Sequence, residues 1–265
     1  MSFLPVVERE LRINARSSRF YWLRFGTALV AIAIIAWLWL VSYGGRSSSA
    51  QMAALAFEVL AWLAFVFCIV LGLFLTADCI SEEKREGTLG LLFLTNLKGY
   101  DVAFGKLASN SFRAIYSLVA IFPVLTIPLL LGGLVGQEIF RVALTLLVTL
   151  IFSLSVGLFI SAFSRHDRKA QFGALFVMIA IAALLPGILL LLENKYGWSI
   201  SKFVYGISPI MSFLLAFQRN YSTNEMQFWV SLGIVHFLSW IAFGAAANII
   251  RGVWQDRPEG VAAIG

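Results

Sequence analysis

The sequence predicts an all-α protein that is integral to a membrane, and three observations support this class. Of the 265 residues, 60% are hydrophobic and 13% are charged, whereas soluble domains carry about 45–50% apolar and about 25% charged residues. Predominantly apolar stretches long enough to form helices recur along the chain, and a helix needs about 20 such residues to cross a bilayer. The short alternating segments of a membrane barrel are absent, and open strands cannot satisfy their backbone groups in lipid.

The first 24 residues predict an amphipathic helix that lies in the lipid headgroup layer. Arginines recur at helical spacing, and apolar residues follow a neighbouring face. Such a helix would place its apolar side toward the acyl chains and its cations toward anionic lipid. A basic flank that only fixes topology is the alternative. The interfacial arginines are Arg9, Arg12, Arg16 and Arg19.

Six membrane-spanning helices follow, within one transmembrane domain over residues 1–250, and residues 251–265 form a short tail. Lys and Arg concentrate in the segments that face the cytoplasm in bacterial membrane proteins. With the N-terminus inside, fourteen basic residues fall on the inner side and five on the outer side. Both termini are therefore expected in the cytoplasm of a bacterial cell, with the chain in its inner membrane. The expected spans are residues 22–43, 52–77, 107–135, 142–163, 172–192 and 227–250.

Several residues within these spans are candidates for contacts along a transport pathway or between two subunits. Ionisable groups within a membrane are costly and often functional, and Glu58 and His236 are the candidates of this kind. Glu58 could instead reach water at the outer interface. His236 could instead form a hydrogen bond with a neighbouring helix, which is the more frequent role of a histidine in a span. Pro123 and Pro128 are expected to kink the third span. Gly132 and Gly136 form a G-x-x-x-G that would permit close helix approach.

The segment before the sixth span, residues 193–226, is expected on the extracytoplasmic side. Its stretch 203–217 is largely apolar, with Gly206 and Pro209 as helix breakers. An ordinary solvated loop would not carry such a stretch. We therefore expect short helices there that rest on the membrane or re-enter it.

The hydrophilic segment 78–106 separates the second and third spans and carries the densest charge in the chain. We expect a charged helix that continues the second span, then a turn at 95–99, and then a new helix with Asp101 in its first turn. This helix–turn–helix would lie at the cytoplasmic surface and present charges and a leucine ledge to another protein. The candidate coupling residues are Glu82, Glu83, Lys84, Arg85, Glu86, Gly87, Thr88, Leu89, Leu91, Leu92 and Lys106.

The string E-E-K-R-E-G-T-L-G-L-L-F-L-T-N-L-K-G-Y-D-V-A-F-G-K-L, residues 82–107, resembles the first cytoplasmic loop of ABC-2 type ABC-transporter permeases. Many members have Thr-Pro where this chain has Thr95-Asn96, so the form of the turn is open. The resemblance implies a transmembrane permease half, paired with an identical or related half and driven by separate ATPase subunits. It also implies export as the usual direction.

The chain itself carries no phosphate-binding motif of the form G-x-x-x-x-G-K-[ST]. The nearest string, Gly99 to Leu107, has one residue too many, and it has Leu where a hydroxyl must reach magnesium. ATP and Mg²⁺ are therefore expected on the partner ATPase, and no catalytic residue, metal site or cofactor is expected in this chain. The net charge of +6 is spread over loops and the N-terminus, which argues against nucleic acid as a partner.

Two other classes remain open. A non-transporting membrane scaffold or assembly factor that docks an ATPase would have the same features. An intramembrane hydrolase is the weaker alternative, because the protease motif E-E-x-x-x-R at Glu82-Glu83 has Gly87 in place of its arginine.

Overall fold

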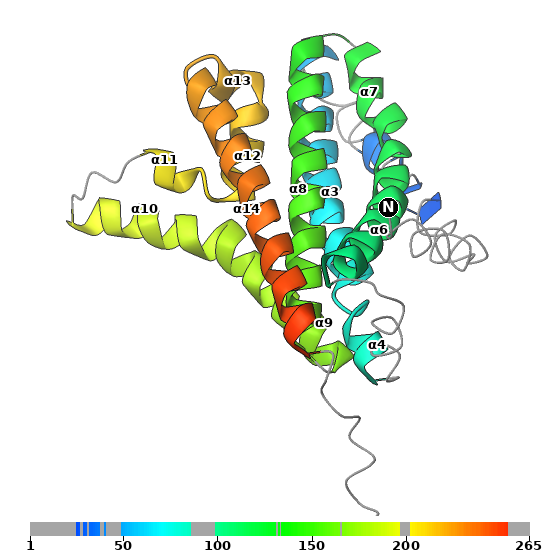
Figure 1. Cartoon of the computed structure of the whole chain (residues 1–265). Helices are drawn as coiled ribbons and strands as arrows, with labels where there is room; N and C mark the ends of the chain where they lie inside the picture. The colour runs from blue at the N-terminus through cyan, green and yellow to red at the C-terminus, as the bar shows by residue number, and fades with distance from the viewer. Residues whose placement is uncertain are drawn as a thin grey trace, which may run out of the picture.

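The computed structural model describes residues 49–85, 99–130, 132, 134–164, 166–196 and 202–253, together with residues 25–26, 29–30, 32–37 and 40 near the N-terminus. The regular structure of these residues is helical throughout, and no strand occurs among them. Figure 1 shows a bundle of long helices with short helices at both ends. This confirms the all-α class that the composition predicts.

Five helical stretches of the described chain are long and apolar enough to cross a membrane. They overlap the expected second to sixth spans. The expected first span, 22–43, is described only in part, and its described residues are helical; the basic segment 1–24 lies outside the described residues. A total of six spans therefore stays a prediction. The five stretches are Ala50–Arg85, Gly99–Leu130, Gly136–Phe163, Arg168–Tyr196 and Glu225–Gly252.

Helix α8 (Gly136–Phe163) is the centre of the bundle. In its most apolar stretch 67% of the residues are buried, the largest share among the five spans. The long helices α3, α6, α9 and α14 all pack against it. Because the central helix is enclosed by protein on most sides, its buried residues lie on several faces, and small hydroxyl residues are among them. The four surrounding helices are α3 (Ser49–Thr76), α6 (Gly99–Val119), α9 (Asp167–Ile179) and α14 (Glu225–Val253).

Helices α3 and α8 approach each other closely through small residues. A Cβ atom at Gly72 would lie 1.8 Å from Ser153 Oγ, and one at Gly157 would lie 2.2 Å from Thr76 Oγ1. The hydroxyl of Thr76 donates to the carbonyl of Leu154 at 2.9 Å. Small residues and hydroxyls of this kind are how helices associate where no hydrophobic driving force exists between them.

The expected third span is two helices, because the chain turns at residues 120–121 between α6 and α7 (Phe122–Leu130). The break lies just before Pro123, which cannot donate to the preceding turn. Pro128 is buried inside α7. The G-x-x-x-G interpretation is wrong: Gly132 has φ +82° in the connection before α8, so the two glycines do not share a helix.

The fifth span consists of α9, a π-helix η1 (Ala180–Leu184) and α10 (Leu185–Tyr196). Figure 1 shows α10 running outward from the α3–α8 pair. Only 17% of the residues in the most apolar stretch of this span are buried. The π-turn coincides with a hydrogen bond of 2.6 Å from Ser208 Oγ to the carbonyl of Ala182.

Three short helices connect α10 to α14, where short helices are expected: α11 (Lys202–Tyr205), α12 (Pro209–Ala216) and α13 (Gln218–Tyr221). Helix α12 is part of the core, since Phe213 is fully buried and stacks on Phe65 of α3 with ring centroids 4.5 Å apart. This explains why the stretch 203–217 is apolar. In α11, a hydrogen bond from Tyr205 to Glu193 raises the pKa of Tyr205 to about 12, so this hydroxyl stays protonated at pH values where a free tyrosine would ionise.

Candidate functional site

The candidate site lies where the hydrophilic segment leaves the second span. Helix α4 (Ser81–Arg85) is separated from α3 by a turn at residues 77–80, so the expected uninterrupted helix is wrong at this point. Ser81 Oγ donates to the carbonyl of Asp78 at 3.1 Å and to its carboxylate at 2.9 Å. Such local side-chain hydrogen bonds compete with the helical ladder, and they give the turn a physical reason.

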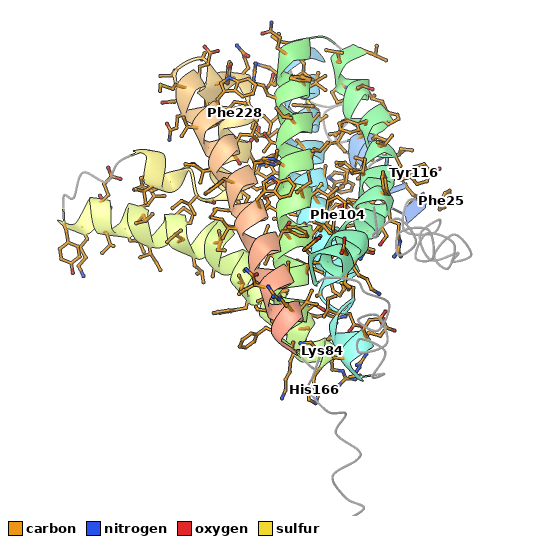
Figure 2. The ribbon with its side chains drawn as sticks, in the orientation of Figure 1. Phe25, Lys84, Phe104, Tyr116, His166 and Phe228 are labelled. Carbon is orange, nitrogen blue, oxygen red and sulfur yellow. The ribbon has the colours of Figure 1, made fainter. Side chains whose placement is uncertain are left out.

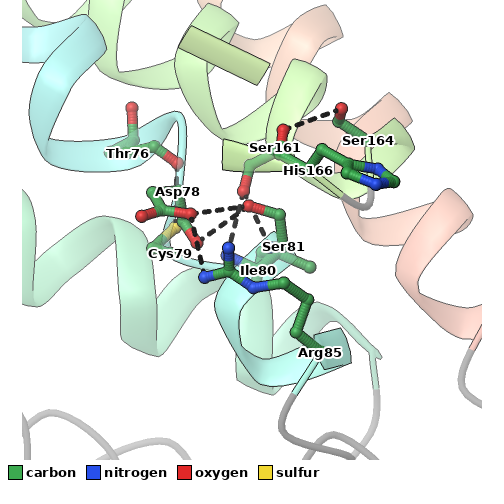
Figure 3. Close-up of polar contacts among 9 residues, drawn as sticks. All are labelled: Thr76, Asp78, Cys79, Ile80, Ser81, Arg85, Ser161, Ser164 and His166. Carbon is green, nitrogen blue, oxygen red and sulfur yellow. Dashed lines mark hydrogen bonds and ion pairs between the residues drawn. The ribbon is translucent and has the colours of Figure 1, made fainter. Parts of the chain in front are cut away.

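Ser161 of α8 binds the start of α4. Its Oγ accepts hydrogen bonds from the backbone N–H of Ile80 at 2.9 Å and of Ser81 at 3.1 Å, as the close-up in Figure 3 shows. The first amides of a helix have no partner within it. The Ser161 hydroxyl therefore acts as an N-cap that comes from another span, and it connects α4 to the last turn of α8.

Ile80 anchors α4 in an apolar cluster. Its side chain is fully buried among residues of three different helices. These are Ala103 of α6, Leu158 and Ala162 of α8, and Ala246 and Ile250 of α14. A displacement of α4 would therefore act on all three helices at once.

Glu83 and Lys106 form a buried ion pair between α4 and α6. Lys106 Nζ donates to Glu83 Oε1 at 2.9 Å, and the two side chains are 8% and 9% exposed. Removing one member of such a pair leaves a buried charge without compensation, which costs about 3–5 kcal/mol. The pair is therefore a strong constraint on the position of α4.

Two further cations of α4 bond within the same end of the bundle. Lys84 donates to the carbonyl of Ala162 in the last turn of α8, where the helix dipole favours a positive charge. Arg85 lies 3.8 Å from the carboxylate of Asp78 in a partly exposed pair. Exposed pairs contribute little, about 0–1 kcal/mol. Figure 2 shows Lys84 and His166 at this end, opposite to Phe228.

The predicted coupling residues divide into three groups. Glu83, Lys84 and Lys106 hold α4 against the bundle, whereas Glu82 and Arg85 are exposed. The others lie outside the described residues, as do the interfacial arginines. Those residues are Glu86, Gly87, Thr88, Leu89, Leu91 and Leu92, with Arg9, Arg12, Arg16 and Arg19.

The candidate pathway residues are not brought together. Glu58 is exposed near the opposite end of the bundle and lines a cavity there. His236 is exposed on α14 and accepts a hydrogen bond of 3.1 Å from Trp240 one turn later. Pro123 is exposed, and Pro128 is buried in α7. Among the described residues, no group of three or more His, Cys, Asp or Glu side chains could hold a metal ion.

Sequence reasoning missed the polar residues of α8. Ser161, Ser153 and Gly157 belong to a stripe of small, buried residues at intervals of four, which starts at Thr145 and includes Thr149. This spacing puts them on one helix face, so the stripe was readable as a helix contact. Arg141 lies one residue before the expected fourth span, 142–163, yet the structure places it inside α8 with 4% exposure.

A family model described as ABC-2 family transporter protein matches residues 4–250 of the chain. No curated protein matches the chain.

Proposed function

The chain belongs to the ABC-2 transporter family and is a membrane permease of an ABC transporter, and we propose that a separate ATPase subunit docks on residues 78–106 and drives it. The arrangement of α4 is the observation that supports docking at this segment. This short helix turns Glu82 and Arg85 outward while its other side is fixed to the bundle.

Such an arrangement suits the transmission of force from a motor protein. The exposed charges of α4 supply a polar rim for a partner surface. Ile80, Ser161 and the pair of Glu83 with Lys106 link the same helix to α6, α8 and α14. A push on α4 would therefore move the ends of three spans together, as alternating access requires.

The family supports a proposal for transport direction and assembly, and the bias of Lys and Arg supports one for orientation in the membrane. We propose an exporter made of two permease halves, identical or related, in the bacterial inner membrane. Both termini and α4 face the cytoplasm, where the ATPase holds ATP and Mg²⁺. The α4 end of the bundle is then the inner end, and the α13 end is the outer end.

Charge reversal at one exposed residue tests the docking proposal. The ATPase that co-purifies with the native chain is reconstituted with the permease in liposomes, and its ATP hydrolysis and its capture by tagged permease are measured. Glu82→Lys should lower capture at least severalfold, because a rim charge mainly governs association. Glu193→Lys on the exposed α10 is the matched control, and it should leave capture unchanged.

Two outcomes would contradict the proposal. If Glu82→Lys and Glu193→Lys capture the ATPase as well as the native chain does, α4 is not the docking helix. If the ATPase binds α4 but no compound ever stimulates its hydrolysis, the chain is a scaffold and not a transporter subunit.

A further inference from the structure

A cavity of about 330 Å³ lies at the end of the bundle opposite to α4. Its walls come from the start of α3, the start of α8 and the α12–α13 segment. Phe57, Leu134 and Phe217 supply apolar wall, and Glu58, Glu138 and Arg219 supply charge. A small concave site with apolar walls and a few convergent polar groups is typical of ligand pockets, which start at about 300 Å³.

Buried polar groups of α8 build the wall of this cavity. Arg141 donates from Nε to the carbonyl of Ala216 at 3.0 Å and from a terminal nitrogen to Gln218 Oε1 at 2.6 Å. Its guanidinium also lies 3.9 Å from the ring centroid of Tyr221. The backbone N–H of Gln218 donates to Glu138 Oε1 at 3.0 Å. The α12–α13 segment is therefore held in place before any ligand arrives.

The charges that remain for a ligand are mainly negative. Within the part of the chain that the structure describes, no hydrogen bond or ion pair engages Glu58 or Arg219. Glu138 uses one oxygen on Gln218. The described residues contain a single buried side-chain oxygen without a partner, Thr149 Oγ1, so the second oxygen of Glu138 is not sealed away from the cavity. Two carboxylates thus face the cavity with one guanidinium.

We propose that this cavity binds an amphipathic ammonium compound, with the cation between Glu58 and Glu138 and the apolar body against Phe57 and Phe217. An anion would meet two carboxylates there. The aromatic walls add a second attraction for an organic cation. The same chemistry occurs in a free amine and in the ethanolamine headgroup of a lipid, and the cavity lies at the end of the spans, within reach of both.

The binding of tritiated 2-phenylethylammonium to the full-length chain in nanodiscs tests this proposal. Equilibrium dialysis is performed without the ATPase, in discs of phosphatidylglycerol, and the signal of empty discs is subtracted. Saturable binding is expected. Glu58→Gln should weaken it about fivefold, the size expected for one partly exposed charge pair. Ala54→Phe, which fills the cavity from the exposed face of α3 without changing its charge, should abolish it.

Glu225→Gln is the matched control, because Glu225 is an exposed carboxylate at the same end but does not line the cavity. It should leave the affinity unchanged. Absence of saturable binding, equal loss in Glu58→Gln and Glu225→Gln, or equal binding of the neutral analogue 2-phenylethanol would each overturn the proposal. Adding phosphatidylethanolamine to the discs separates the two sources: displacement of the probe identifies the lipid headgroup, and its persistence identifies a free amine.

Discussion

Each end of α8 holds a short helix through polar side chains and backbone carbonyls, but the two ends differ in how their charges are arranged. Near its C-terminus, α8 holds the short helix α4 through Ser161 and the carbonyl of Ala162. Near its N-terminus, it holds α13 through Glu138 and Arg141. At the α4 end Glu83 and Lys106 form a closed ion pair beside the exposed Glu82 and Arg85, whereas at the α13 end the charges surround a cavity.

This difference separates two tasks that polar groups perform in an apolar bundle. The Glu83–Lys106 pair has almost no exposed surface, so its value lies in fixing one element against another. At the other end Arg141 holds the α12–α13 segment in place, while the side chains of Glu58 and Arg219 stay exposed. A closed ion pair suits mechanical coupling, and charges around a cavity suit the binding of a small ligand.

The largest effect is expected at the closed ion pair. Glu83→Gln should lower the free energy of unfolding by about 3 kcal/mol, because it removes the carboxylate that lies 2.9 Å from the buried Lys106 ammonium. Lys106→Met should cost a similar amount. The double variant Glu83→Met/Lys106→Met should recover most of the loss, since apolar replacement of both partners is often neutral. Denaturation in detergent measures all three. Losses that simply add in the double variant would show that the two residues act independently.

A smaller effect is expected at Arg141. Arg141→Met keeps much of the side-chain volume but leaves the Ala216 carbonyl and the Gln218 amide without their donor. A loss of about 2 kcal/mol is expected for these charge-assisted bonds. Hydrogen exchange should increase in residues 209–221 and remain unchanged in α4. Arg219→Met, an exposed neighbour, is the control. An equal increase at both ends of the bundle would contradict a local role for Arg141.

The smallest effect is expected at Ser161. Ser161→Ala removes the acceptor for two amides of the α4 region, at a cost of about 1 kcal/mol, as for other N-cap losses. Ser164→Ala is the matched control, because its hydroxyl makes only a long, exposed contact of 3.4 Å with the carbonyl of His166. Faster amide exchange at Ile80 and Ser81 would report the loss. Unchanged exchange there would show that the other contacts of α4 hold it in place without the Ser161 hydroxyl.

The helical class and the five described spans could be predicted because both depend on summed composition. Each stretch is so apolar that errors of several residues in its bounds do not change its nature. The second span shows this, since residues 52–77 are expected and α3 is Ser49–Thr76. The charged segment after it could also be located, because a run from Glu82 to Glu86 cannot enter the bilayer.

The partners of individual residues could not be predicted, because they depend on which helices are neighbours. Nothing local distinguishes Glu83, which is buried, from Glu82, which is exposed. The contacts of Gly72 and Gly157 likewise depend on Ser153 and Thr76 in other helices. Arg141 was misplaced because a charge at the edge of an apolar run also fits a flanking loop, and only the fold supplies its carbonyl partner in α12.

The π-helix between α9 and α10 has a consequence for how this sequence can vary. A π-turn is equivalent to one residue inserted into an α-helix, and the wide turn absorbs that residue locally. Deleting one residue from 180–184 would therefore restore a regular α-helix there and withdraw the carbonyl that Ser208 binds. Relatives that lack this residue should also differ at position 208.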